Sequence, residues 1–374
     1  MPSFTGRLAT SLALASLLVG CATAGTPATN PTGSGASSGS VGQNPVNPSE
    51  VWPIKTREHI DLWLHGFAMI SEDSTLVPYF RRGYKSDMTA VKSRSNLVTQ
   101  LDANNARLKE RLGLNSALVN AQFLPLYFNS LDEITNAVDI FYRAEGDPRR
   151  ASNQQTAETI ALLAGYFQNP ADRDWVRLFV QSLRDEDARF YRSYWDQQQR
   201  ERGAVLTAVS NRWQNTYRAR FQPFLNNTSQ AVGEIFLSLP LDGEGRSLTA
   251  GKRQNAMAVT FPLRSSDADE SIYAIAHELV SSIVSVAVND NVTPTEQRNG
   301  VSDRYVANGT VRAGALLLQK IAPELASGYA RYYLLSANRA SGGNPLGALE
   351  SVFSLPSAIS SAISRQLDVV LGGI

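Results

Sequence analysis

The spacing of hydrophobic and polar positions divides the chain into a long helical stretch, a short strand-rich stretch and a second helical stretch. From Arg57 to about Asn215, apolar residues recur every three or four positions. In the segment TREHIDLWLHGFAMI this spacing puts Ile60, Leu64 and Phe67 on one face of a helix. The pattern therefore predicts an N-terminal region built from amphipathic helices.

The pattern changes near Val232. The runs VGEIFLSLPL and QNAMAVTFPL predict two strands, and the segment LDGEGRSL (residues 241–248) between them predicts a hairpin turn. A polar loop then leads into a helix that contains His277. The segment TVRAGALLLQKIAPELASGYARYYLL predicts further helices divided near Pro323, and a last helix is expected from Ser357 onward. The expected fold class is α+β and mostly α, with residues 51–374 as a single domain.

Residues 1–20 have the features of a signal peptide. A single positive residue, Arg7, precedes an apolar run of signal-core length that ends in LVGC. This ending resembles the lipobox of bacterial lipoproteins, and the resemblance implies that Cys21 is lipidated and becomes the first mature residue. With Ala22 next, it also implies the outer membrane in a Gram-negative cell, facing the periplasm or the cell surface. The alternative is an ordinary secretory signal with a chance cysteine.

The segment from Cys21 to Glu50 is expected to be a disordered tether. After the cysteine it is rich in Gly, Ser, Thr, Pro and Asn and has almost no large apolar residue. Such a segment cannot bury enough apolar surface to offset the entropy of ordering. It would hold the folded region, which begins near Val51, at a distance from a membrane reached through the lipid on Cys21.

Composition and charge exclude several classes of function. The formal net charge of +1 provides no overall field for nucleic acid, and a single cysteine excludes intramolecular disulfides and a cysteine zinc site. The segment from Ala188 to Phe221 interleaves arginine with aromatic residues, as a surface for single-stranded nucleic acid does. Its aromatic residues have helical spacing and acidic residues alternate with its arginines, which favours a packed helix. No nucleic-acid partner is expected.

The segment SIYAIAHELVSSIV carries the candidate chemistry, because its His277-Glu278 pair begins like the zinc-protease sequence His-Glu-x-x-His. The order strand, loop, His-Glu helix, polar loop, helix over residues 230–335 resembles the gluzincin metallopeptidases. The resemblance implies that His277 matches the first zinc ligand and Glu278 the catalytic base. Ser281 stands where the second histidine belongs, and Gly309, after Asn308, stands where that family has a glutamate ligand. We therefore expect no metal and no other cofactor at this site.

The expected function is that of a lipid-anchored envelope protein with a degenerate metallopeptidase-like domain, a pseudoenzyme that binds polypeptide or a protein partner without cleaving it. One alternative is an active zinc metallopeptidase with unusual ligands, for which Asp290 and Glu296 in the following loop are candidates. Another is a structural envelope lipoprotein unrelated to these peptidases. A serine hydrolase that uses Ser281 and His277 is disfavoured because no oxyanion donors are identifiable.

The remaining histidines, His59 and His65, lie on the first predicted helix. They are six positions apart, so they point to different sides of that helix. With Glu58 and Asp61 nearby they could form an acid–base group. The pattern favours a packed helix with one or two exposed ionisable side chains instead.

Overall fold

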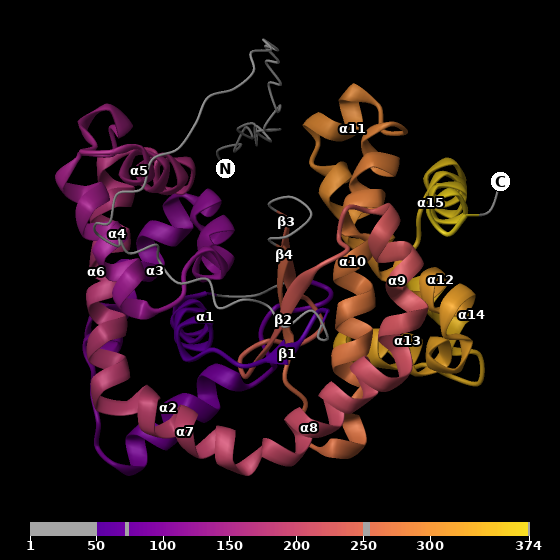
Figure 1. Ribbon diagram of the computed structural model, residues 1–374, viewed down its shortest axis with the longest axis horizontal. Helices are drawn as coiled ribbons and strands as arrows, with labels where there is room; N and C mark the ends of the chain where they lie inside the picture. The colour runs from indigo at the N-terminus through magenta and orange to yellow at the C-terminus, as the bar shows by residue number, and fades with distance from the viewer. Residues whose placement is uncertain (1–50, 72–74, 250–254, 373–374) are drawn as a thin grey trace, which may run out of the picture.

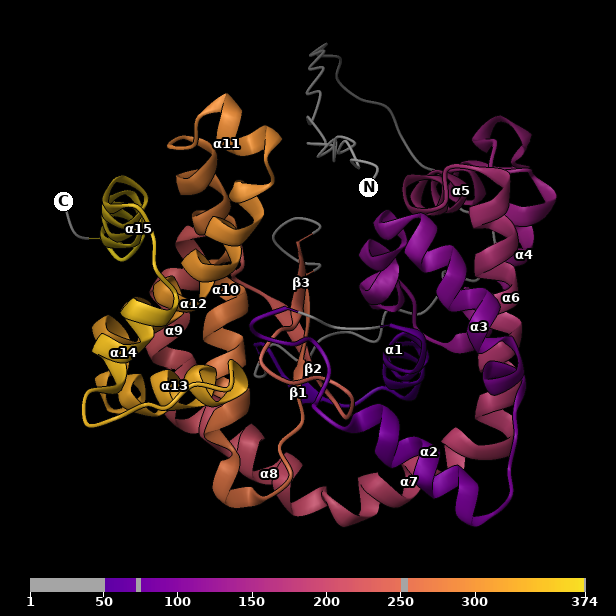
Figure 2. The same cartoon turned by 180° about the vertical axis from the view of Figure 1, so that it is seen from behind.

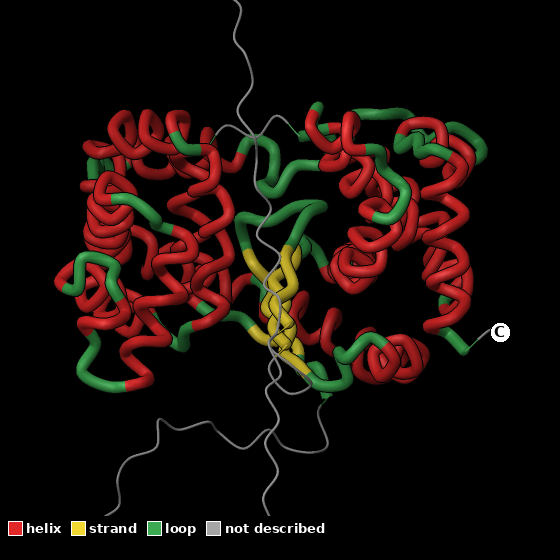
Figure 3. The backbone as a smooth tube through the Cα atoms, turned by 90° about the horizontal axis from the view of Figure 1, so that it is seen from above, coloured by secondary structure: helices red, strands yellow, loops and turns green. Residues whose placement is uncertain are grey.

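The structure, a computed structural model, describes residues 51–71, 75–249 and 255–372. Two groups of helices lie on either side of a small central sheet (Figures 1 and 3). The helices α7 and α8 run along one end of the molecule between them (Figure 1). The view from behind shows the same arrangement (Figure 2). The predicted α+β, mostly α class is confirmed. The predicted signal peptide, Cys21 and the predicted tether lie outside the described residues.

The N-terminal lobe consists of the helices that precede α7. They are α1 (Glu58–Ile70), α2 (Tyr84–Arg94), α3 (Gln100–Leu114), the 3₁₀ segment η1 (Ser116–Tyr127), α4 (Leu131–Arg143), the 3₁₀ turn η2 (Pro148–Arg150), α5 (Gln154–Tyr166), α6 (Pro170–Glu186) and the π-helical turn η3 (Asp187–Tyr191). Its core is apolar and rich in aromatic rings, such as the stacked pair Trp175 and Phe179.

The connecting helices and the C-terminal lobe follow. They are α7 (Arg192–Glu201), α8 (Gly203–Arg212), the π-helical turn η4 (Trp213–Tyr217), α9 (Arg218–Asn227), the 3₁₀ turn η5 (Ser265–Asp267), α10 (Asp269–Asn289), α11 (Pro294–Arg298), α12 (Val301–Ile321), α13 (Pro323–Ser336), α14 (Pro345–Val352) and α15 (Ser357–Val370). The predicted helices around His277, on both sides of Pro323 and from Ser357 are therefore present.

The sheet has the strand order β1-β2-β4-β3. Its strands are β1 (Ile54–Lys55), β2 (Gly233–Ser238), β3 (Arg246–Thr249) and β4 (Asn255–Thr260). β1, β2 and β4 are parallel, whereas β3 is antiparallel to β4 and forms the edge. The predicted hairpin turn in LDGEGRSL is wrong, because β4 lies between β2 and β3 and the segment crosses from one side of β4 to the other.

Both faces of the sheet are buried, one against each lobe. Ile235 and Met257 are register partners that join the core of the C-terminal lobe. Their neighbours Phe236 and Ala258 face the opposite way and join the core of the N-terminal lobe. Successive side chains of a strand point to opposite faces, so a strand between two cores is apolar at consecutive positions. This explains the consecutive apolar residues 235–237 and 256–259.

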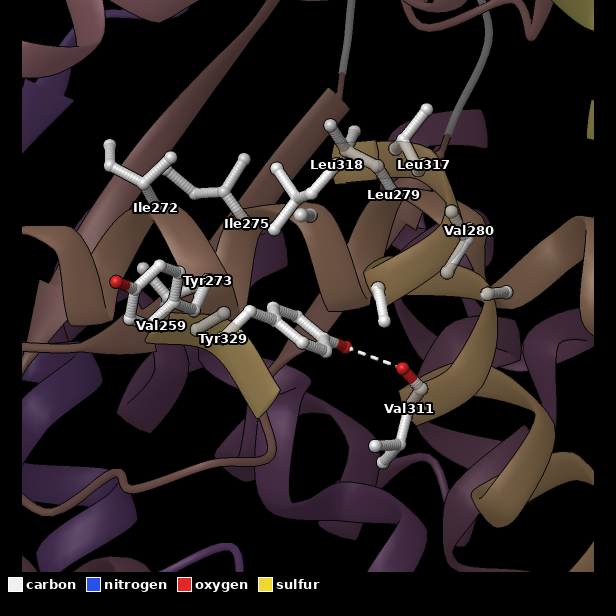
Figure 4. Packing of buried hydrophobic residues seen from close by; sticks show 14 of the residues in the cluster. Val259, Ile272, Tyr273, Ile275, Leu279, Val280, Val311, Leu317, Leu318 and Tyr329 are labelled. Atoms are coloured by element: carbon white, nitrogen blue, oxygen red, sulfur yellow. Dashed lines mark hydrogen bonds between the residues drawn. The ribbon is translucent and has the colours of Figure 1, made fainter. Parts of the chain in front are cut away.

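The helix α10 forms the centre of the C-terminal core. Figure 4 shows Ile275 and Leu279 of α10 packed near Leu318 of α12, with the Tyr329 hydroxyl donating to the Val311 carbonyl at 3.0 Å. The stretch that contains this helix, Ser265–Asn289, is the one segment of the described chain that is long and apolar enough to cross a membrane. Its most apolar window is 78% buried inside the protein, as is usual for a central core helix.

Asp61 joins the N-terminal lobe to the sheet. This α1 residue is fully buried, and its carboxylate accepts hydrogen bonds from Trp195 Nε1 of α7 at 2.8 Å and from the Leu239 N–H after β2 at 3.2 Å. Burial raises the pKa of Asp61 to about 7, against the opposing effect of the hydrogen bonds from Ser238, Trp195 and Leu239.

This pKa makes the stability of the fold depend on pH. An unfolded aspartate has a pKa near 4, so folding favours the protonated form of Asp61, and this contribution is lost as the pH rises from about 4 to about 7. Burial likewise raises the pKa values of Glu58 and Glu270 to about 7.

We expect the free energy of unfolding to decrease between pH 5 and pH 7.5 and to decrease less in Asp61→Asn. Urea unfolding at both pH values measures this. The exposed Asp139→Asn change is the control, and an unchanged slope in Asp61→Asn would contradict the assignment.

Candidate functional site

A large cleft lies beside the His277 helix. It has a volume of about 1160 Å³ and is lined by His277, Glu278 and Ser281 of α10. Residues 244–247, which lead into and begin the edge strand β3, also line it. Further lining comes from residues 297–300 before α12, from the first turns of α12, and from Thr75, Leu76, Val77, Tyr79 and Asn120 on the side of the N-terminal lobe. The cleft therefore brings together the sheet edge, the His-Glu helix and the following helix.

His277 and Glu278 are adjacent on α10 and bind each other. His277 Nδ1 lies 3.0 Å from Glu278 Oε1, and the Gly245 N–H donates to the same carboxylate oxygen at 3.0 Å. The Tyr333 ring stacks on the imidazole, with ring centres 5.2 Å apart and an angle of 18° between the planes. The Tyr333 hydroxyl in turn donates to the Gly243 carbonyl at 2.9 Å. The histidine ring is therefore held by packing as well as by hydrogen bonding.

Glu244 is the third member of this cluster, and sequence reasoning missed it. Its Oε1 lies 3.8 Å from His277 Nε2, and Glu244, His277 and Glu278 offer ligand atoms within 4.8 Å of one another. The available signal was a glutamate flanked by two glycines in DGEG. A Cβ on Gly245 would lie 2.4 Å from the Ala258 carbonyl oxygen, and one on Gly243 would lie 2.7 Å from a Val77 methyl. Both glycines are needed for the close approach of this segment.

Two opposing effects set the charge of His277. Burial disfavours the imidazolium ion and lowers its pKa. The nearby carboxylate of Glu244 and the hydrogen bond and charge of Glu278 act in the opposite direction and outweigh burial, so the pKa of His277 is raised. The cluster therefore stabilises positive charge at its centre.

The positions predicted to replace the gluzincin ligands lie in different surroundings. Ser281 lines the cleft, but its hydroxyl donates to the Glu278 carbonyl of its own helix at 3.0 Å. Gly309 is buried, and a Cβ there would lie 2.6 Å from Val284 of α10, so a side chain at this position would point into the helix contact. Two α12 residues are exposed in the cleft: Ala307, which has no ligand atom, and Asp303, whose carboxylate is not part of the Glu244, His277 and Glu278 cluster. The described residues therefore do not fit a zinc ion held by the family's three ligands.

The other two histidines belong to separate networks in the N-terminal lobe. His59 Nε2 lies 2.9 Å from the Phe128 carbonyl oxygen. His65 lies between the Tyr84 hydroxyl, 3.1 Å from Nδ1, and the Glu186 carboxylate, 3.0 Å from Nε2. Both histidines are buried, so the expected exposed ionisable side chains are not found at these positions.

The remaining sequence candidates have local structural contacts. Glu58 forms an ion pair with Arg192 at 3.3 Å. Asp290 is the C-cap residue directly after α10, and Glu296 caps α11 by accepting from the Thr293 N–H at 2.9 Å. Neither Asp290 nor Glu296 is among the residues that line the cleft.

The chain matches no protein-family model, and no curated protein or solved structure matches it. The comparison with gluzincins therefore depends on residues 230–335 alone. There the structure has strand β4, a short loop, the His277 helix α10, a polar segment and helix α12 in that order.

The close contact at Gly245 generates a prediction. In Gly245→Ala, the added methyl would meet the β4 backbone, so the segment must move away from Glu278. We expect a loss of about 1–3 kcal/mol in the free energy of unfolding, as for other overpacked sites. The matched control is Gly113→Ala in α3, where no atom lies within 4 Å of the added Cβ. Chemical denaturation of both variants is the measurement, and equal stabilities would contradict the packing argument.

Proposed function

We propose that this chain is a lipid-anchored envelope protein whose cleft binds an extended segment of another polypeptide without cleaving it. The observation that carries the proposal is the position of the edge strand β3 next to the cleft. An edge strand presents backbone N–H and C=O groups with which an extended peptide can pair as an additional strand.

The chain itself already uses this mode of pairing next to β3. Residues 78–81 run beside the crossover, where the Asp242 N–H donates to the Tyr79 carbonyl at 2.7 Å and the Arg81 N–H donates to the Pro240 carbonyl at 2.9 Å. These bonds end before β3 begins. A peptide that continues along β3 would extend the same edge into the cleft.

The cleft lining suits a polypeptide backbone. Hydroxyl and amide side chains, which both donate and accept hydrogen bonds, predominate near α10 and α12. They include Ser247, Ser281, Ser285, Asn289, Gln297, Asn299, Ser302, Asn308 and Thr310. Arg246 and Arg298 add positive charge, whereas Glu244 and Asp303 add negative charge, so the cleft favours no single sign of ligand.

Binding without cleavage is supported by the state of the catalytic positions. A zinc peptidase needs three protein ligands and a base that activates the metal-bound water. Here the base position, Glu278, is 5% exposed and accepts hydrogen bonds from Gly245 and His277. Ser281 supplies no second imidazole.

Filling the cleft tests polypeptide binding. Ala307 is exposed on α12 inside the cleft, whereas Ala90 is exposed on α2 outside it, so Ala307→Trp and Ala90→Trp form a matched pair. We expect Ala307→Trp to weaken binding of a fluorescein-labelled, permanently unfolded polypeptide at least tenfold by fluorescence anisotropy. Ala90→Trp should bind as the wild type does.

Three outcomes would contradict the proposal. Equal weakening in both variants would remove the cleft from the argument, and absence of binding in the wild type would favour a purely structural lipoprotein. Cleavage of the probe, lost in Glu278→Gln, would establish the active peptidase instead.

The anchor is tested separately at Cys21. In a bacterial host, the full chain should incorporate radiolabelled palmitate and sediment with membranes, because a lipidated cysteine is its proposed attachment. Cys21→Ser should lose the label and leave the membrane fraction, whereas Ala22→Gly should retain both. Membrane sedimentation of Cys21→Ser at the wild-type level would contradict the anchor.

A further inference from the structure

The second ring nitrogen of His277 is buried and has no hydrogen-bond partner among the described residues. The histidine side chain is 3% exposed. A buried polar atom without a partner costs free energy, so native proteins rarely leave one unless it serves a purpose. Nε2 therefore requires a physical explanation.

The hydrogen bond on the opposite side of the ring determines what Nε2 can do. The Glu278 carboxylate only accepts hydrogen bonds, so His277 Nδ1 must carry the proton that it shares with Glu278. In the neutral ring, Nε2 then presents a lone pair. Histidines that bind metals commonly have this arrangement, in which a carboxylate holds the far N–H and fixes the ring's tautomer and orientation.

Glu244 is close enough to share an ion with this lone pair. Zinc lies about 2.0–2.2 Å from imidazole nitrogen and carboxylate oxygen, so two such ligand atoms can be at most about 4.3 Å apart. Nε2 and Glu244 Oε1 are 3.8 Å apart. Both residues line the cleft, so the remaining coordination positions can be filled from it.

We propose that His277 Nε2 and a carboxylate oxygen of Glu244 bind a divalent transition-metal ion of the zinc type, with Glu278 as the positioning residue for the histidine. This pair differs from the ligand set that the gluzincin resemblance implies, because Glu244 does not stand at any of the positions matched to that set, which are His277, Ser281 and Gly309. The imidazole ligand selects zinc over Mg²⁺ and Ca²⁺, which prefer oxygen ligands. The inference goes beyond polypeptide binding and does not depend on it.

Isothermal titration of the metal-free full chain with zinc chloride at pH 8 tests the site, because the ligand nitrogen must be deprotonated to bind. Every protein carries Cys21→Ser so that the thiol cannot contribute. We expect one equivalent of zinc to bind in a background of excess Mg²⁺. His277→Ala should abolish this binding, and Glu244→Gln and Glu278→Gln should each weaken it at least tenfold. His59→Gln is the control and should bind as the parent does.

A second variant, Ser281→His, tests whether zinc binding can be strengthened. It places a second imidazole four positions from His277 on the same helix face and should tighten zinc binding at least tenfold. Circular dichroism checks the fold of each variant. If His277→Ala fails to fold, Glu244→Gln still tests the site, because Glu244 is partly exposed and its replacement disturbs the core less. Absence of zinc binding, equal binding in Glu244→Gln, or no gain in Ser281→His would each overturn the site. Loss of zinc with polypeptide binding intact would leave the proposed function standing.

Discussion

The hydrogen bond from the Gly245 N–H to Glu278 is the contact on which the cleft depends. It fixes the crossover segment against α10 at one point, and the edge strand β3 begins one residue later. The same carboxylate accepts from His277, so one side chain sets both the position of the sheet edge and the orientation of the imidazole. Only glycine permits this approach, because a Cβ would collide with the Ala258 carbonyl of β4.

The rest of the fold holds this contact in place from two sides. The parallel strands β2 and β4 are buried on both faces, so the sheet cannot shift without exposing apolar surface to water. Asp61 of the N-terminal lobe connects the first helix to the end of β2. Within the C-terminal lobe, Tyr333 of α13 packs on His277. The cleft is therefore a boundary between two separate cores that share one sheet.

The sequence predicted those parts of the fold that have a strong apolar pattern. The runs that became β2 and β4 and the helix with His277 were predicted because burial on every side leaves a continuous or periodic apolar signal. β1 and β3 were missed because Ile54–Lys55 is too short and RSLT (residues 246–249) has no apolar run. The turn before β3 was misjudged because adjacency in sequence favours a hairpin, whereas β4 is inserted between its neighbours.

The candidate site was only partly predictable for the same reason. His277 and Glu278 are neighbours in sequence, and their helical context was visible. The proximity of Glu244 to His277 arises from a crossover more than thirty positions away, and no periodicity reports such a contact. Likewise, the direction of Gly309 depends on how α12 packs against Val284.

The His277-Glu278 pair has a structural role that does not depend on catalysis. Glu278 accepts the hydrogen bond from His277 Nδ1, which would otherwise be a buried donor without a partner. Removing Glu278 would also release Gly245 and, with it, the sheet edge. The pair therefore contributes to the stability of the fold whether or not the cleft has any catalytic activity. The buried Nε2 is different, because the pair's own hydrogen bond does not involve it and it adds nothing to that stability. The structural role of the pair thus accounts for Nδ1 and Glu278, whereas Nε2 faces Glu244 at 3.8 Å and is the ring atom left available to a ligand.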